Sequence, residues 1–240
     1  MRFDHANGES YEDAGGGRVI HSAPGFPGFP PRLAVELFER ARLLTGRERV
    51  GLWDPMCGAG GIPTAVAMLR PERVQRVLAS DVDPAAVTLA AKNLALATPA
   101  GLAERRRELT ARGADADRLA AIDRLLDVPG RSSALRTDAV EADVTDAGSL
   151  ARLDLDGIHV ALCDLPYGTQ TSWSAATSAG PPAAAALETL GAVLPTGAVV
   201  VFVTTERDDL RPLPNATRSF KHGHRHVRMY RLGEAAGGAD

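Results

Sequence analysis

The sequence predicts an α/β protein built on a doubly wound, mainly parallel sheet. Two observations support this fold class: apolar runs of strand length alternate with segments of helical periodicity, and turns rich in glycine and proline separate them. Strands that alternate with helices form a parallel sheet with helices packed on its faces. With 240 residues, 45% of them hydrophobic, the chain has the size and composition of one domain with a sizeable core.

Residues 1–46 are expected to form a strap and a helix that precede the main domain at 47–240. Residues 1–20 are polar and glycine-rich, which predicts a loose start. Residues 22–31 are rich in proline and therefore stiff. They form either a simple strap or, through their aromatic side chains, a wall of a ligand site. Pro31 suits the first turn of an apolar-periodic helix that Gly46 can end.

The main domain is expected to alternate strands and helices along its length. Hydrophobic periodicity defines the elements, and prolines suited to first helical turns define several starts. The expected elements are strands at 50–53, 77–80, within 134–144, 158–163 and 198–204, helices at 62–69, 84–93, 102–127 and 182–194, and a final strand pair around 217–221 and 226–231.

The segment from Asp164 to Gly168 follows the fourth expected strand and is the most informative motif. It places a carboxylate, rigid carbonyl groups and an aromatic ring at the carboxyl edge of the sheet, where open α/β sheets bind ligands. This set suits a planar nucleobase, because the oxygens accept its N–H groups and the ring stacks on it. The alternative is a turn that merely ends the strand. The candidate catalytic residues are Asp164, Leu165, Pro166 and Tyr167.

A glycine-rich loop at residues 54–61 joins the first expected strand to the next helix. Its glycines let the backbone approach a ligand closely. Asp54 leads the loop, and its charge would repel a pyrophosphate but attract a cationic amino-acid group. S-adenosylmethionine carries such an ammonium group, and a sulfonium besides. The loop therefore predicts S-adenosylmethionine as the cofactor rather than a dinucleotide.

Acids at the ends of the next two strands complete the predicted cofactor site. Asp81 ends the second strand, where a carboxylate can accept both ribose hydroxyls of an adenosine. Asp83 is interpreted first as a helix cap. The third strand should present an acid to the adenine amino group, and Asp143 is preferred over the alternative, Asp138. The candidate cofactor-binding residues are Asp54, Cys57, Gly58, Gly60, Asp81, Asp83 and Asp143.

The charge distribution indicates one candidate surface for nucleic acid. The net charge of −3 does not itself suggest such a partner, but residues 210–233 contain no acid and many arginines and histidines. This cluster is either a local phosphate-binding patch or a solvated hairpin that binds nothing. The candidate RNA-binding residues are Lys221, Arg225 and Arg228 of this cluster, together with Trp173, which either extends the stacking surface for the base or belongs to the core.

Other features exclude several classes of protein. No apolar run approaches the ~20 residues of a membrane span, and the N-terminus lacks the pattern of a signal peptide. The two cysteines, Cys57 and Cys163, do not have the spacing of metal ligands. We therefore expect a cytoplasmic monomer that binds neither a metal nor a membrane.

Three motifs together resemble the class I S-adenosylmethionine-dependent methyltransferases. They are the loop that begins at Asp54, the segment from Ser80 to Pro84 with the downstream Ala91-Lys92-Asn93, and Asp164 to Tyr167. The last motif is similar to the group that methylates nitrogens of nucleobases or glutamine amides. Four segments, 21–27, 52–58, 91–102 and 164–173, further resemble the AviRa family of avilamycin-resistance 23S rRNA methyltransferases.

The resemblance implies a Rossmann-like, seven-stranded sheet whose last two strands form an antiparallel hairpin. It implies methylation of a guanine in 23S rRNA, with N1 favoured, and resistance to orthosomycin antibiotics such as avilamycin. The partner would be 23S rRNA or the large ribosomal subunit. The residues themselves leave open another RNA base, the exocyclic N2 of guanine, and a catalytically silent ribosome-binding protein on the same fold.

Overall fold

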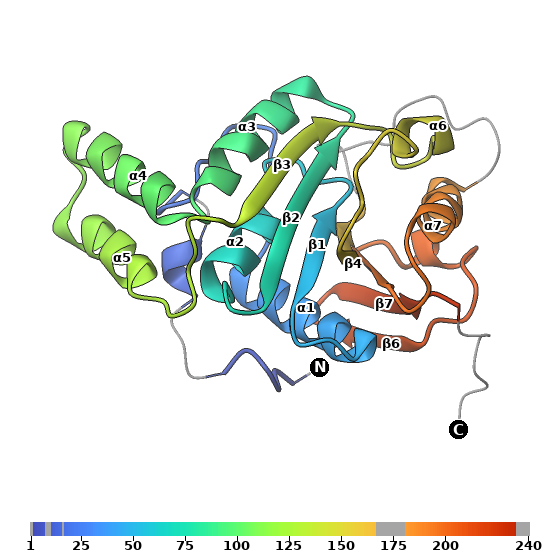
Figure 1. The fold of residues 1–240 in the computed structure, drawn as a ribbon. Coiled ribbons are helices and arrows are strands. Elements are labelled where there is room, and N and C mark those ends of the chain that lie inside the picture. The colour runs from blue at the N-terminus through green and yellow to red at the C-terminus, as the bar shows by residue number, and fades with distance from the viewer. Residues whose placement is uncertain (1, 8–10, 16, 167–180, 234–240) are drawn as a thin grey trace.

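The protein is built around a seven-stranded sheet with the strand order β3-β2-β1-β4-β5-β7-β6 (Figure 1). This computed structural model describes residues 2–7, 11–15, 17–166 and 181–233. β1 to β5 are parallel, whereas β7 is antiparallel to both β5 and β6. The expected α/β class and antiparallel C-terminal hairpin are confirmed. The strands are β1 Val50–Asp54, β2 Val74–Asp81, β3 Arg136–Glu141, β4 Ile158–Asp164, β5 Val199–Thr204, β6 Arg218–His222 and β7 Arg225–Arg231.

Helices cover both faces of the sheet, so its central strands are apolar on both sides. Along β5, Val199, Val201 and Val203 pack with α1, α2 and α3. The alternate residues Val200 and Phe202 pack with α6 and α7 on the other face. This alternation follows from the two-residue repeat of a strand. The helices are α1 Pro31–Thr45, α2 Gly61–Leu69, α3 Pro84–Ala95, α4 Pro99–Ala111, α5 Ala116–Leu126, α6 Ala147–Leu150 and α7 Pro182–Val193.

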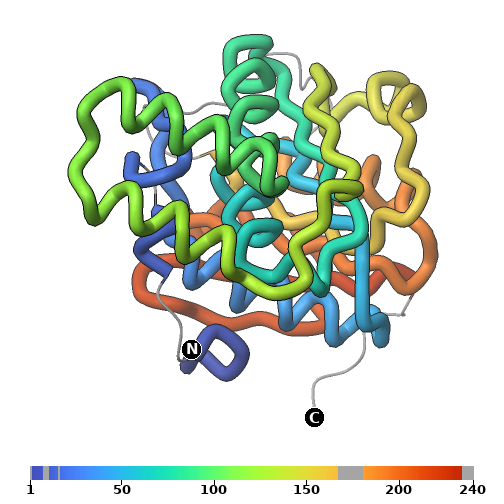
Figure 2. The backbone as a smooth tube through the Cα atoms, turned by 60° about the vertical axis from the view of Figure 1, so that its left-hand side comes forward, coloured from blue at the N-terminus to red at the C-terminus, as the bar shows by residue number. Residues whose placement is uncertain are grey.

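The segment expected as one charged helix over 102–127 is instead the helical hairpin α4–α5 (Figure 2). Gly113 breaks the helix with φ of 70°, a left-handed conformation that favours glycine. Asp115 then caps α5, because its carboxylate accepts the N–H of Arg118 at 2.8 Å. The expectation was wrong because helical periodicity continues on both sides of the turn.

The expected loose start is also wrong for the described part of residues 1–20. Ala6, Tyr11 and Val19 are buried. Buried Glu36 of α1 accepts the backbone N–H groups of Asp4, His5 and Ala6 at 3.0, 2.8 and 2.8 Å. Figure 2 shows residues 11–15 and 17–20 beside α4 and α5, and arginines of these two helices donate to the carbonyls of Val19 and Arg18. The N-terminal segment is therefore part of the folded unit.

No helix among the described residues is long and apolar enough to cross a membrane.

Candidate functional site

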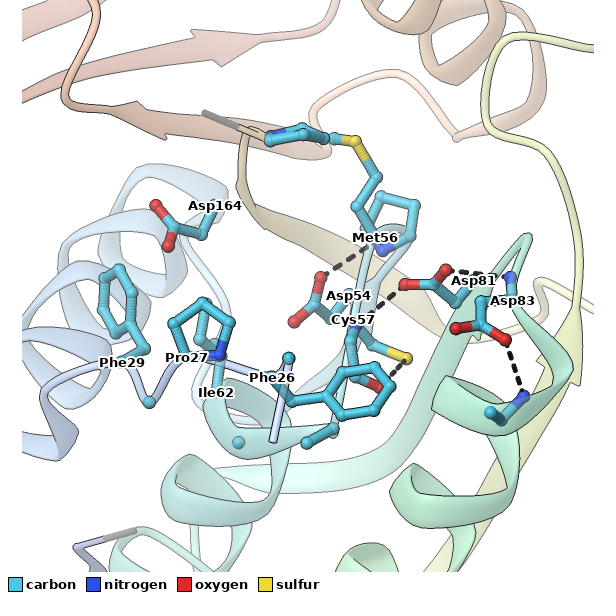
Figure 3. Close-up of a pocket in the computed structure, with 18 of the residues that line it drawn as sticks. Phe26, Pro27, Phe29, Asp54, Met56, Cys57, Ile62, Asp81, Asp83 and Asp164 are labelled. Carbon is cyan, nitrogen blue, oxygen red and sulfur yellow. Dashed lines mark hydrogen bonds between the residues drawn. The ribbon is translucent and has the colours of Figure 1, made fainter. Parts of the chain in front are cut away.

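A cavity of about 900 Å³ lies at the carboxyl edge of the parallel strands (Figure 3). The sheet edge forms one side of it, and the proline-rich segment 20–30, which we call the strap, forms the other. Open α/β sheets bind ligands at this edge. The lining residues are Ala14, Ile20 to Ser22, Pro24 to Pro30, Asp54 to Ala59, Gly61, Ile62, Asp81 to Asp83, Ala85, Ala142 to Val144 and Asp164 to Pro166.

Three of the predicted acids come from the ends of neighbouring strands. Asp54 ends β1, Asp81 ends β2 and Asp164 ends β4. β1 pairs with both β2 and β4, so the topology brings these carboxylates to one edge of the sheet. All three line the cavity, as the sequence predicts.

Asp81 is held by the backbone on both of its oxygens. Oδ2 accepts the N–H of Gly58 at 2.8 Å, and Oδ1 accepts the N–H of Asp83 at 3.1 Å. The N–H of Cys57 donates to the carbonyl of Ser80 at 3.0 Å, which ties the glycine-rich loop to the end of β2. These bonds fix the Asp81 carboxylate at the cavity wall, where it could accept a pair of ribose hydroxyls.

Asp54 is a buried carboxylate that lacks a cationic partner among the described residues. Burial raises its pKa well above the usual range, and the nearby Asp81 and Asp164 raise it further. Its carboxylate accepts the N–H of Met56 at 3.3 Å. A ligand ammonium group would therefore relieve an electrostatic cost at this position.

Asp83 and Asp143 line the cavity while holding local turns. Asp83 caps α3, because Oδ1 accepts the N–H of Ala85 at 2.8 Å. Asp143 Oδ1 accepts the N–H and the hydroxyl of Thr145 at 2.8 and 2.7 Å. The alternative adenine ligand, Asp138, pairs with Arg76 at 3.2 Å and is not among the described lining residues. The geometry therefore favours Asp143 over Asp138.

The loop residues have different roles. Gly58 lines the cavity, with φ of 50°. Gly60, with φ of 71°, is not among the described lining residues; a Cβ there would lie 2.9 Å from Ala90 Cβ, so this glycine lets α3 pack closely. Cys57 is a buried free thiol at the cavity wall, and burial raises its pKa well above the usual value.

The acceptor motif is described as far as Pro166. Asp164, Leu165 and Pro166 line the cavity, and the N–H of Leu165 donates to the carbonyl of Val203 at 2.8 Å. This bond continues the β4–β5 ladder by one residue and fixes the backbone that follows Asp164. The predicted Tyr167 and Trp173 lie outside the described residues.

Of the two alternatives for the proline-rich segment, the structure supports the wall of a ligand site, because its aromatic residues line the cavity. Phe26 lies beside Cys57, whereas Phe29 and Pro27 lie on the same side of the cavity as Asp164 (Figure 3). The alternation of aromatic residues with proline is the signal that could have identified them, because proline holds such rings in place at little entropic cost.

Asn93 of α3 is a residue that the sequence did not assign. Its Nδ2 donates to the carbonyls of Ala59 and His21 at 2.8 and 3.0 Å, and its Oδ1 accepts the N–H of His21 at 2.8 Å. The side chain is fully buried. Asn93 therefore ties the glycine-rich loop to the strap.

The three predicted RNA-binding residues of the C-terminal hairpin lie on different faces of the sheet. The guanidinium of Arg225 lies over the ring of Phe29, 5.2 Å from its centroid, and thus beside the cavity. Val227 and Met229 face the core of α1 to α3, so the alternate residues His226 and Arg228 lie on the opposite face of the sheet. Lys221 pairs with His226 and therefore lies on that opposite face too.

Comparisons with known proteins agree with this geometry. The model of a family described as rRNA methyltransferase AviRa matches residues 1–225. A curated relative, the 23S rRNA (guanine(2535)-N(1))-methyltransferase of Streptomyces viridochromogenes, is 43% identical over 200 residues, or 80% of each chain. A solved structure of the rRNA methyltransferase AviRa from that organism matches with a TM-score of 0.83 and 37% identity, over 96% of each chain.

TrmN from Thermus thermophilus shares the fold, with a TM-score of 0.50 and 20% identity over 92% of this chain and 52% of its own. The fold is therefore the seven-stranded methyltransferase sheet that the motifs predict. The family match, the identity to the curated relative and the structural match together place the protein: the chain belongs to the AviRa family of rRNA methyltransferases.

Proposed function

We propose that the protein transfers a methyl group from S-adenosylmethionine to N1 of a guanine in 23S rRNA, and that this methylation confers resistance to avilamycin. The observation that carries the proposal is the strand-edge cavity, in which the acids of β1, β2 and β4 meet. The name of the curated relative, a guanine N1 methyltransferase of 23S rRNA, supplies the acceptor. An rRNA acceptor implies a cytoplasmic enzyme, and we propose that it acts as a monomer.

The residues around the glycine-rich loop fit S-adenosylmethionine. Asp81 would accept the ribose hydroxyls. Because its carboxylate is already fixed, those hydrogen bonds would form with little loss of side-chain conformational entropy. Asp54 would bind the ammonium group, since a buried carboxylate gains most from a cation. Asp143 would accept from the adenine amino group, and Asp83, Cys57, Gly58 and the loop around Gly60 would complete the wall. When bound, the cofactor supplies an electrophilic methyl group on a sulfonium.

Asp164 and the following residues would hold the acceptor base. The Asp164 carboxylate and the Leu165 carbonyl would accept the N–H groups of guanine and stabilise positive charge as it develops on the base. Asp164 would take up the N1 proton that leaves as the methyl group bonds to N1. Pro166 stiffens this turn, and Tyr167 would stack on a base flipped out of the RNA. Alignment of this kind can lower a barrier by about 7–11 kcal/mol.

The test is incubation of the protein with labelled S-adenosylmethionine and unmethylated 23S rRNA, followed by reverse transcription. A methyl group on N1 blocks the pairing edge of guanine, so extension should stop next to the guanine equivalent to position 2535 of the relative's name. Label in the RNA without a stop would indicate that the methyl group is attached to another atom, such as N2. The absence of label from the RNA would overturn the proposal.

A further inference from the structure

The strap and the C-terminal hairpin meet beside the acceptor end of the cavity, at Phe29 and Arg225. Phe29 lines the cavity and packs partly against the core of α1 to α3. The guanidinium of Arg225 lies 5.2 Å from the centroid of its ring. Such a contact holds a guanidinium in place without neutralising its charge.

Arg225 differs from the arginines that serve the fold. Arg76 and Arg124, for example, each bind carboxylates. No acidic partner of Arg225 is present among the described residues, and its Nε is buried without an acceptor in that part of the chain. Its Nη1 lies within hydrogen-bond distance of His224 Nε2, at 3.4 Å, and the imidazole carries no negative charge. The arrangement therefore leaves a positive charge available for a ligand anion.

The sheet register places this charge near Asp164. Asp164 pairs with Val203 of β5, and the next residue of β5, Thr204, pairs with His226 of β7. Arg225 therefore stands at the same edge of the sheet as Asp164. Two strand spacings separate their strands, or about 10 Å. That separation suits a nucleotide whose base reaches Asp164 while its phosphate stays outside the cavity.

We propose that Phe29 and Arg225 form an acceptor subsite for a nucleotide extruded from RNA, an inference that rests on the proposed guanine methylation. The Phe29 ring contacts the base at the strap side of the cavity. Arg225, oriented by that ring, binds the phosphate attached to the same or the neighbouring nucleotide. Pro27 and Pro30 flank the ring and limit the entropy lost when it contacts the base.

The experiment compares Phe29→Leu and Arg225→Gln with the wild-type protein, using a transcript of 23S rRNA that contains the target guanine. Phe29→Leu keeps an apolar side chain but removes the ring, so kcat/KM for RNA should fall about 10-fold. Arg225→Gln should raise KM for RNA about 10-fold and reduce the salt slope of RNA affinity by about one. Both variants should keep the wild-type affinity for S-adenosylmethionine within about twofold, because neither residue faces the acids of the cofactor end.

Arg218→Gln is the matched control. Arg218 lies on the same hairpin and the same face, paired with Met229, so it is about 13 Å along the hairpin from the pair His222 and Arg225. The Arg218→Gln variant loses the same charge as Arg225→Gln, yet its affinity for RNA and the salt slope of that affinity should match those of the wild type. An equal effect of Arg218→Gln and Arg225→Gln would overturn the subsite, because it would indicate a diffuse basic surface.

Two further outcomes separate this inference from the proposed function. If wild-type protein binds the transcript without methylating it, the proposed function fails, and the salt slope of Arg225→Gln still decides the inference. If Phe29→Leu lowers the affinity for S-adenosylmethionine instead of kcat/KM for RNA, the ring belongs to the cofactor wall and the inference is wrong. A melting temperature near the wild-type value for each variant excludes loss of folding as the cause.

Discussion

The two ends of the cavity are built by different means. At the cofactor end, each acid sits at the end of a strand or in the loop that follows, and backbone N–H groups of the glycine-rich loop and of the start of α3 hold Asp81 and Asp83. At the acceptor end, Asp164 is joined by Phe29 from the strap and Arg225 from the hairpin. The cofactor end is thus organised by local chain geometry, whereas the acceptor end depends on segments that are distant in sequence.

Asn93 connects the two ends. It binds the glycine-rich loop through Ala59 and the strap through His21. The difference between the ends predicts separable defects: changes at the cofactor end should alter cofactor affinity, changes at the acceptor end should alter transfer to RNA, and changes at Asn93 should affect both.

The largest effect is expected from Asp164→Ala at the acceptor end. Methyl transfer to 23S rRNA should fall by about 10³-fold or more, because the base loses the carboxylate that orients it and stabilises its developing charge. Calorimetric titration should give an affinity for S-adenosylmethionine within about threefold of the wild type. Near-normal transfer in this variant would mean that another group holds the base.

Asp81→Ala should produce the opposite pattern. The affinity for S-adenosylmethionine should fall about 10- to 100-fold, since charge-assisted hydrogen bonds to the ribose are lost. The rate at saturating cofactor should change much less. Asp138→Ala is the control, because Asp138 is an acid of the neighbouring strand β3 that pairs with Arg76 and Arg136. Unchanged cofactor affinity in Asp81→Ala, or an equal loss in the control, would contradict the assignment of Asp81 to the ribose.

Asn93→Ala should weaken both ends at once through the fold. Up to three backbone groups, of Ala59 and His21, lose their partner, and the free energy of unfolding should fall by about 2–4 kcal/mol. Denaturant unfolding measures this loss. Asn93→Asp keeps the acceptor for the His21 N–H but not the two donors, so it should also be destabilised. If Asn93→Ala has the same free energy of unfolding as the wild type, the hydrogen bonds from Asn93 to Ala59 and His21 do not stabilise the fold.

The smallest effect concerns the pH dependence of cofactor-free protein. Burial raises the pKa of Asp54 in the folded state, so its contribution to stability is fully present below the unfolded pKa of about 4 and is lost as the pH rises through the raised pKa. Asp54→Asn removes this loss, and its melting temperature at pH 7 should exceed the wild-type value by about 2–4 °C. Cofactor should stabilise the wild type more than the variant. A lower melting temperature for cofactor-free Asp54→Asn would contradict this account.

Most of the sheet and the cofactor acids could be predicted because their signals are local. An apolar run specifies β4, and parallel topology then brings Asp54, Asp81 and Asp164 together without further information. The Asp83 cap was read correctly for the same reason, since Pro84 and the helical periodicity adjoin it. In contrast, the break at Gly113 was missed because helical periodicity continues across it.

The contact between Phe29 and Arg225 at the acceptor end could not be predicted from local patterns. Packing of Phe29 under Arg225 depends on how the strap and the hairpin dock on the finished sheet. The folded N-terminus escaped prediction for a similar reason, because its polar groups are satisfied by Glu36 of α1 and by arginines of α4 and α5. The expected strand at 226–231 left out Arg225, so its place on the face opposite to Arg228 became visible only with the observed extent of β7 and its packing.

Nucleoside mass spectrometry of 23S rRNA after incubation with the protein and labelled S-adenosylmethionine tests the central claim most directly, because it identifies both the base and the atom that accept the methyl group. The account predicts labelled 1-methylguanosine in the wild-type reaction and none in the Asp164→Ala reaction. Label in N2-methylguanosine or in any other nucleoside, or RNA that remains unlabelled, would contradict it.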